Sequence, residues 1–168
     1  MSSELLQHSL LYGAILSLVM SITFLALLFT NPEMWLNDYP PDIQEKFGAM
    51  SEKAQKLKKM VGVPVILLMV GIVALAIVQW AQAHPGSLTF SDLFISSFLI
   101  MTIFNLVDLV ILDWLIFVTI QPSIIILPGT EGAAGYKDYA FHFFAFLKGV
   151  VLSIVTSLIF AGVAMLFQ

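Results

Sequence analysis

The chain has 168 residues, of which 60% are hydrophobic and 11% charged, and its formal net charge is −4. Soluble domains are roughly half apolar and about a quarter charged, so this composition predicts an integral membrane protein. It argues against a soluble enzyme, a disordered segment and a nucleic-acid-binding protein. The chain contains no Cys, which excludes disulfides, thiolate metal sites and cysteine nucleophiles.

Four apolar stretches are long enough to cross a membrane. A spanning helix needs about 20 mostly apolar residues, and a helix satisfies its own backbone hydrogen bonds within lipid. The predicted spans cover residues of about 10–29, 61–80, 93–120 and 141–167. We therefore predict an all-α fold, an integral membrane four-helix bundle formed by a single domain over residues 1–168.

The seven basic residues are all Lys, and all belong to one side of this bundle. Lys137 lies in the third loop, and Lys148 lies just inside the fourth span from the same side. The first loop carries the other five: Lys46, Lys53, Lys56, Lys58 and Lys59. Because cytoplasmic loops are enriched in Lys and Arg, we expect two cytoplasmic loops and both termini on the outer, non-cytoplasmic side.

The first loop, between the first two spans, carries two helix-start signals. Asn31 followed by Pro32 and Glu33 is typical of a helix N-terminus, and Ser51 is placed to cap a basic run over 52–60. We expect this run to attract anionic lipid, with a protein-docking helix as the alternative.

The third loop, between the last two spans, contains a five-residue apolar run, 123–127, between prolines. This run is too short to span, so we expect it to lie in the interface or to dip back as a short re-entrant piece.

The third span contains polar residues that are expensive to place in lipid. At 100° per residue, Asn105, Asp108 and Asp113 fall in one broad sector of an α-helix, with Thr102 in or near it. We expect this sector to face the bundle interior. Asp108 would be a titrating group suited to a proton relay or a cation site, with Asn105 as its hydrogen-bond partner. The alternative is that these side chains only hold neighbouring helices together.

The positions of Asp113 and Lys148 along their spans suggest that the two lie at the same depth in the membrane. Asp113 lies seven residues before the end of the third span, and Lys148 lies seven residues into the fourth. We expect an ion pair between Asp113 and Lys148, or else that both side chains snorkel to the surface or line a water-filled site.

The fourth span has small residues every four positions, which allow helices to approach closely and favour packing within the chain or between copies. These residues are Ala145, Gly149, Ser153, Ser157 and Ala161.

Two further clusters carry groups that could bind ligands. On the third-loop side these are Glu131, Lys137, Asp138 and His142, which together suggest a site for a lipid-like substrate. Asp138 and His142 stand four residues apart and are a weak candidate for a metal site. At the opposite end the weak metal candidates are Glu4, His8, His84 and Asp92.

The leading functional expectation is a small transport or channel-like protein, which handles a proton, a cation or a small solute through the polar sector of the third span. The first alternative is a membrane-embedded enzyme or binding protein for a lipid-like substrate at the third loop. The second is an accessory subunit without chemistry of its own. The sequence names no cofactor. As partners we expect membrane lipids and either a second copy of the chain or another membrane protein, but no nucleic acid.

Overall fold

The computed structural model describes residues 2–85 and 89–166, and within them it confirms the all-α fold and the four predicted spans. The first three spans are longer than predicted, because each helix extends past its apolar stretch, and the fourth begins two residues earlier than predicted. The spans are α1 (Ser3–Thr30), α3 (Glu52–Ala83), α4 (Phe90–Val107) continued by the π-helix η2 (Asp108–Ile120), and α5 (Tyr139–Met165).

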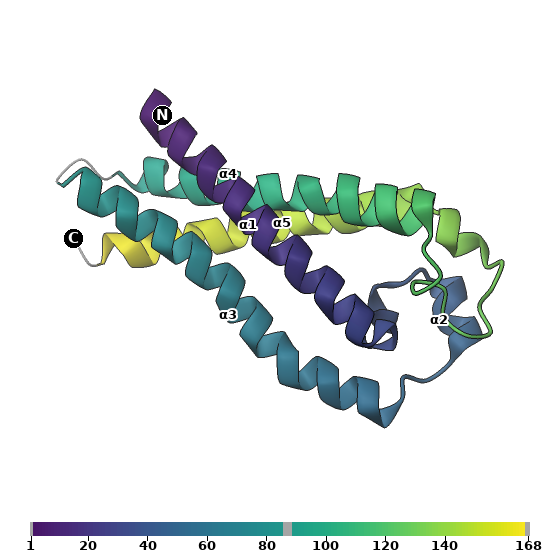
Figure 1. Ribbon diagram of the computed structural model, residues 1–168. Coiled ribbons are helices and arrows are strands. Elements are labelled where there is room, and N and C mark those ends of the chain that lie inside the picture. The colour runs from purple at the N-terminus through teal and green to yellow at the C-terminus, as the bar shows by residue number, and fades with distance from the viewer. Residues whose placement is uncertain (1, 86–88, 167–168) are drawn as a thin grey trace.

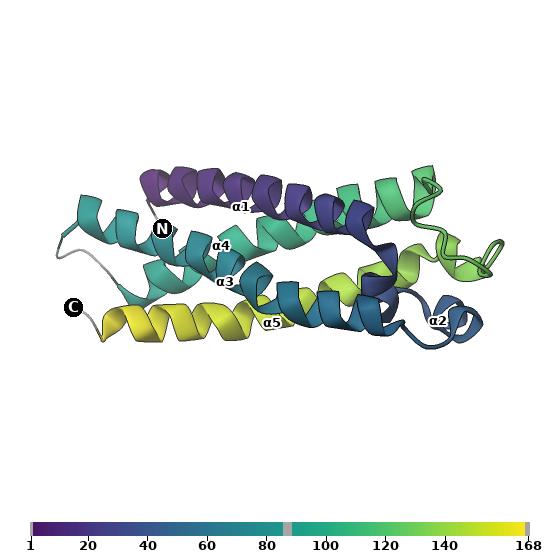
Figure 2. The ribbon, with the colours of Figure 1, turned by 60° about the horizontal axis from the view of Figure 1, so that its bottom comes forward.

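The helices run side by side as an elongated bundle (Figures 1 and 2). Helix α4 packs against both α1 and α5, while α3 packs mainly against α1. A buried apolar cluster joins the spans and includes Leu16, Val73, Ile100 and Phe104. The start of α1 and the end of α5 lie at one end of the bundle, and the first and third loops lie together at the other (Figure 1).

Local signals in the first loop act as predicted. Asn31 accepts a hydrogen bond from the backbone of Glu33 and caps the 3-10 helix η1 (Pro32–Asp38). Ser51 caps α3 through the backbone of Ala54. The basic run does not form a separate surface helix, because α3 continues from it without a break through the second span.

The first and third loops pack on each other and form a second hydrophobic cluster. Its members come from η1, from α2 (Pro41–Phe47), from the third loop and from η3 (Ala134–Lys137). Ile125 and Leu127 are only 1% exposed. The apolar run of the third loop is therefore covered by protein at this end of the bundle, where the sequence suggested an interfacial or re-entrant piece. We call this two-loop structure the loop cap.

The close approach of α1 and α4 requires a glycine. A Cβ atom at Gly13 would lie 2.7 Å from Cδ1 and 2.9 Å from Cβ of Ile103, and the Cβ atom of Ile103 cannot move without the backbone. Nearby, the hydroxyls of Ser9 and Ser96 are 2.9 Å apart across the same interface. This contact stabilises the half of the bundle away from the loop cap.

We expect Gly13→Ala to lower the free energy of unfolding by about 1–3 kcal/mol, because overpacking forces the two helices apart. Thermal unfolding of the purified protein in detergent measures this effect. Gly71→Ala is the matched control, since nothing lies within 4 Å of the Cβ position at Gly71. Equal unfolding temperatures for the two variants would contradict the prediction.

Candidate functional site

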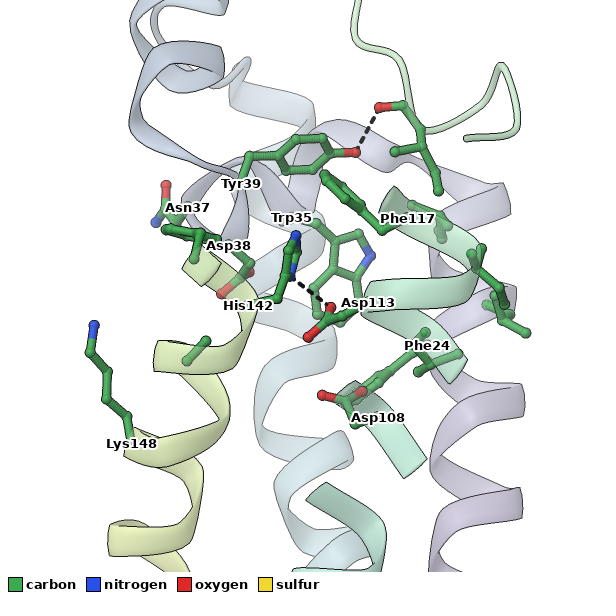
Figure 3. Close-up of a pocket in the computed structure, with 17 residues that line it drawn as sticks. Phe24, Trp35, Asn37, Asp38, Tyr39, Asp108, Asp113, Phe117, His142 and Lys148 are labelled. Atoms are coloured by element: carbon green, nitrogen blue, oxygen red, sulfur yellow. Dashed lines mark hydrogen bonds and ion pairs between the residues drawn. The ribbon is translucent and has the colours of Figure 1, made fainter. Parts of the chain in front are cut away.

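A cavity of about 490 Å³ lies at the loop-cap end of the bundle, between α1, η1, η2, α5 and the third loop (Figure 3). Pockets of this size are typical of small-molecule sites. Its polar lining residues are Asn37, Asp38, Asp108, Asp113, His142 and Lys148. Aromatic side chains form much of the remaining wall: Phe24, Trp35, Tyr39, Phe117 and Phe141. We call it the acidic cavity, since it has three carboxylates and one lysine.

The π-helical geometry of η2 turns two carboxylates toward the acidic cavity. In an α-helix, Asp108 and Asp113 would project about 140° apart. In η2 the backbone instead bonds residues five apart, as in the bond from Gln121 N to Ile116 O, so residues five apart lie near one another on the same face. Asp108 and Asp113 therefore line the same cavity, as predicted. The reason is the π-helical geometry and not the α-helical spacing on which the prediction was based.

Asp113 pairs with His142, not with Lys148. Nδ1 of His142 lies 3.1 Å from Oδ1 of Asp113 (Figure 3). Lys148 is exposed, and within the described residues it forms no ion pair. The expected pair between Asp113 and Lys148 is therefore wrong. Asp113 and Lys148 were expected to pair because they lie at similar depths in their spans. The actual partner of Asp113 depends on which sides of η2 and α5 face each other.

His142 is buried, with 3% of its surface exposed. Its ring packs 4.8 Å from that of Phe117 and 5.4 Å from that of Phe141, measured between centroids. Because a carboxylate can only accept, Nδ1 carries the hydrogen that Asp113 receives, and Nε2 is left with a lone pair when the ring is neutral. Within the described part of the chain Nε2 has no hydrogen-bond partner, and neither has the buried Nε1 of Trp35.

The first loop contributes residues to the cavity that the sequence did not single out. Asp38 lies 3.6 Å from Nζ of Lys58 on α3. Burial raises the pKa of Asp38 above its ordinary value, and the nearby charge of Lys58 opposes that shift only in part. Tyr39 donates a hydrogen bond to the carbonyl of Ile125, and burial raises its pKa as well. A polar Asn-Asp pair at the end of a short helix was the available signal, but only the packing of the loop places it at the cavity.

Asn105 and Thr102 do not line the acidic cavity. The amide of Asn105 donates to the hydroxyl of Ser153 on α5 at 2.8 Å, and the Asn105 side chain fills the space next to Gly149. Asn105 is therefore not the hydrogen-bond partner of Asp108, and the expected continuous polar sector is wrong beyond Asp108. The Thr102 hydroxyl is buried and has no partner among the described residues. Asn105 instead joins α4 to α5, in agreement with the alternative that polar residues of the third span hold neighbouring helices together.

The candidate site on the third loop does not assemble. Glu131 is exposed and accepts from the backbone of Gly129, and Asp138 caps α5 through the backbone of Phe141. Lys137 and Asp138 border an open hollow next to α2, whereas His142 belongs to the acidic cavity. The four residues were grouped by their nearness in sequence, but the start of α5 separates them in space.

The weak metal candidates do not come together either. Nε2 of His84 lies 3.4 Å from Oε2 of Glu4, but Nε2 of His8 contacts the carbonyl of Ala76. Asp92 interacts with Thr89 at the start of α4. Over residues 2–85 and 89–166, no group of three His, Cys, Asp or Glu side chains is arranged to hold a metal ion.

Comparison of the chain with protein-family models, with curated proteins and with solved structures finds no match. The fold and the composition define a multi-pass helical membrane protein.

Proposed function

We propose that this chain is a small transport protein, in which the acidic cavity takes up a proton or a cation from the loop-cap end of the bundle. One observation carries the proposal: the cavity joins Asp108, twelve residues inside the third span, to Asn37 and Asp38 of the first loop. Carboxylates within a spanning helix are expensive unless they face a protein interior or water, and they commonly mark ion pathways.

A carrier fits the structure better than an open channel. Beyond Asp108, the interior is filled by direct contacts such as the Asn105–Ser153 hydrogen bond and the close approach of Gly13 to Ile103. A solute bound in the cavity would need a rearrangement of these contacts to leave at the opposite end. The π-helix η2 borders both regions, and π-helical segments are frequent at functional sites.

The two alternatives have less support. An enzyme or binding protein for a lipid-like substrate would use the third-loop residues, which do not converge. An accessory subunit, docking on lipids, on a second copy or on another membrane protein, leaves the acidic cavity without a role.

Proton flux into vesicles tests the transport proposal. We expect reconstituted protein to dissipate an imposed pH gradient faster than protein-free vesicles, with potassium, sodium or tetramethylammonium in the lumen and the membrane potential clamped. Asp108→Asn keeps the shape of the side chain but removes its charge, so it should reduce the rate to that of protein-free vesicles. Asp138→Asn is the matched control, because its carboxyl lies outside the cavity and Asn also caps helices. No wild-type flux under any condition, or equal flux in Asp108→Asn, would overturn the proposal.

We further propose that the loop cap faces the cytoplasm, as the distribution of Lys indicates. Because the chain has no Cys, single cysteines report sidedness cleanly. Ala49→Cys and Glu131→Cys should be protected from a membrane-impermeant maleimide in intact cells, and Ser3→Cys and Ala83→Cys should be labelled. All four positions are exposed in the bundle. The reverse labelling pattern would contradict this orientation.

A further inference from the structure

The lysines at the start of α3 divide between two sides of the helix. Lys58 faces inward, where its Nζ lies 3.6 Å from the carboxylate of Asp38. On the opposite side Lys53, Lys56 and Lys59 are exposed, and at 100° per residue they fall within a sector of about 120°. We call these three residues the outer lysine face.

The outer lysine face has little acidic charge to balance it. Glu52 is the only acidic residue in the sequence of α3. Glu33 of η1 reaches the start of α3, but it accepts a hydrogen bond from the hydroxyl of Ser51 at 2.7 Å. Over residues 2–85 and 89–166, none of the three lysines forms an ion pair. Like charges one turn apart repel each other, so an anion bound between these lysines would stabilise the helix.

Apolar side chains continue this side of α3 into the second span. Met60, Val63 and Leu67 project within about 40° of Lys56 around the helix. They are 65%, 62% and 63% exposed, and the first half of α3 diverges from α1 at the edge of the bundle (Figure 1). One side of α3 therefore has positive charge at its start and an uncovered apolar surface next to it.

The two parts of this surface match the depths of the two parts of a phospholipid. At 1.5 Å per residue the apolar stretch 61–80 is about 30 Å long, which is the thickness of the hydrocarbon core of a bilayer. Lys59 and Lys56 come about 3 Å and about 7.5 Å before this stretch. Both ammonium groups therefore reach the headgroup layer, which is about 5–7.5 Å thick on each side.

We propose that the outer lysine face binds an anionic phospholipid, whose phosphate lies between Lys56 and Lys59 and whose acyl chain follows Met60, Val63 and Leu67. Positive charge at the headgroup level and apolar side chains at the hydrocarbon level favour a lipid over a protein partner, since both levels are occupied by lipid in a membrane. The inference does not rest on the transport proposal, because no residue of this surface lines the acidic cavity.

Lipid selection by the full-length protein in detergent tests this inference. The protein is equilibrated with equal amounts of dioleoyl phosphatidylglycerol, which is anionic, and dioleoyl phosphatidylcholine, which has no net charge. Native mass spectrometry resolves the species with a single bound lipid. A lysine near an anionic headgroup favours binding roughly fivefold, so two lysines should enrich phosphatidylglycerol over phosphatidylcholine by roughly 30-fold.

Paired substitutions locate the site. Lys56→Gln together with Lys59→Gln should lower the enrichment by roughly 30-fold, to nearly equal binding of the two lipids. Lys46→Gln together with Lys137→Gln is the matched control, because it removes the same charge from two exposed lysines of the loop cap. This control should keep the enrichment of the wild type. Circular dichroism should show the same helix content in both double variants, since all four side chains are exposed.

Three outcomes would overturn the inference. The first is equal binding of the two lipids by the wild type, or an equal loss of enrichment in the two double variants. The second is displacement of phosphatidylglycerol by glycerol 1-phosphate, which carries the phosphate without acyl chains. The third is an unchanged lipid ratio in Lys56→Gln/Lys59→Gln with loss of a co-purifying protein, which would assign this side of α3 to a protein partner. Proton flux in vesicles bears on the transport proposal alone.

Discussion

His142→Ala is expected to lower the free energy of unfolding by roughly 2–4 kcal/mol, because it removes a buried ring and leaves the Asp113 carboxylate without its donor inside a spanning segment. The ring is 3% exposed and packs against Phe117 and Phe141. The expected loss lies below that of a fully buried pair, since the Asp113 side chain is 27% exposed. Chemical denaturation in mixed micelles, followed by circular dichroism, measures the change.

A double-mutant cycle separates the contribution of the Asp113–His142 interaction from that of the packing of the His142 ring. Asp113→Leu in the His142→Ala background removes the orphaned carboxylate, so the double variant should be less destabilised than the sum of the single variants. His84→Ala is a matched histidine control. Nε2 of His84 contacts the carboxylate of Glu4 at 3.4 Å at the opposite end, and the Glu4 side chain is 74% exposed, so the loss of this contact should cost less than about 1 kcal/mol. Strict additivity of the two substitutions would show that Asp113 and His142 do not stabilise each other.

The sequence was sufficient to predict the four spans and where the loop helix η1 and the spanning helix α3 begin. These features depend on short-range chemistry: a run of apolar residues of membrane length, and side chains such as Asn31 and Ser51 that cap the backbone next to them. The shared end of the first and third loops follows from the number of spans alone. Each of these predictions requires only the composition of one segment at a time.

The cavity depends on features that single segments do not encode. The close approach of Asp113 to the face of Asp108 results from a π-helix, whereas a helical wheel at 100° per residue spreads the two carboxylates about 140° apart, at the two edges of the predicted sector. The pairing of Asp113 with His142 depends on how two spans face each other. Counting residues from the ends of the spans places Lys148 at the same depth as Asp113. Such a count does not indicate which side of α5 faces η2.

The structure of the loop cap depends most clearly on contacts between residues that are far apart in the sequence. The carboxylate of Asp42 accepts a hydrogen bond at 2.9 Å from the backbone of Gly135, 93 residues further along the chain. A Cβ atom at Gly135 would collide with Asp42 and Pro40, so this contact needs a glycine. Each loop alone is a set of turns, and only their contact creates the buried surface that covers the cavity. The same contact brings Asp38 to a site otherwise built from spanning helices.

Tyr136→Phe is expected to loosen the loop cap and to lower the free energy of unfolding by about 1–3 kcal/mol, the cost of leaving buried polar groups unpaired. The Tyr136 hydroxyl accepts from the backbone of Leu127 at 2.9 Å and lies 2.7 Å from the hydroxyl of Thr130. Both tyrosine and threonine are buried, at 3% and 0% exposed. Phe fills the same space but cannot accept from Leu127, so the amide of Leu127 should exchange its hydrogen faster.

Tyr139→Phe is the matched control for this substitution. Tyr139 is 45% exposed, and its hydroxyl lies 2.9 Å from that of Thr119, where water can replace the lost group. Hydrogen exchange across residues 123–136, measured by mass spectrometry, should therefore accelerate in Tyr136→Phe and remain unchanged in Tyr139→Phe. Because Ile125 both borders the acidic cavity and belongs to the loop cap, a loosened cap should also speed the entry and release of a bound cation. Faster exchange without faster release would show that the cap stabilises the fold but does not limit access to the cavity.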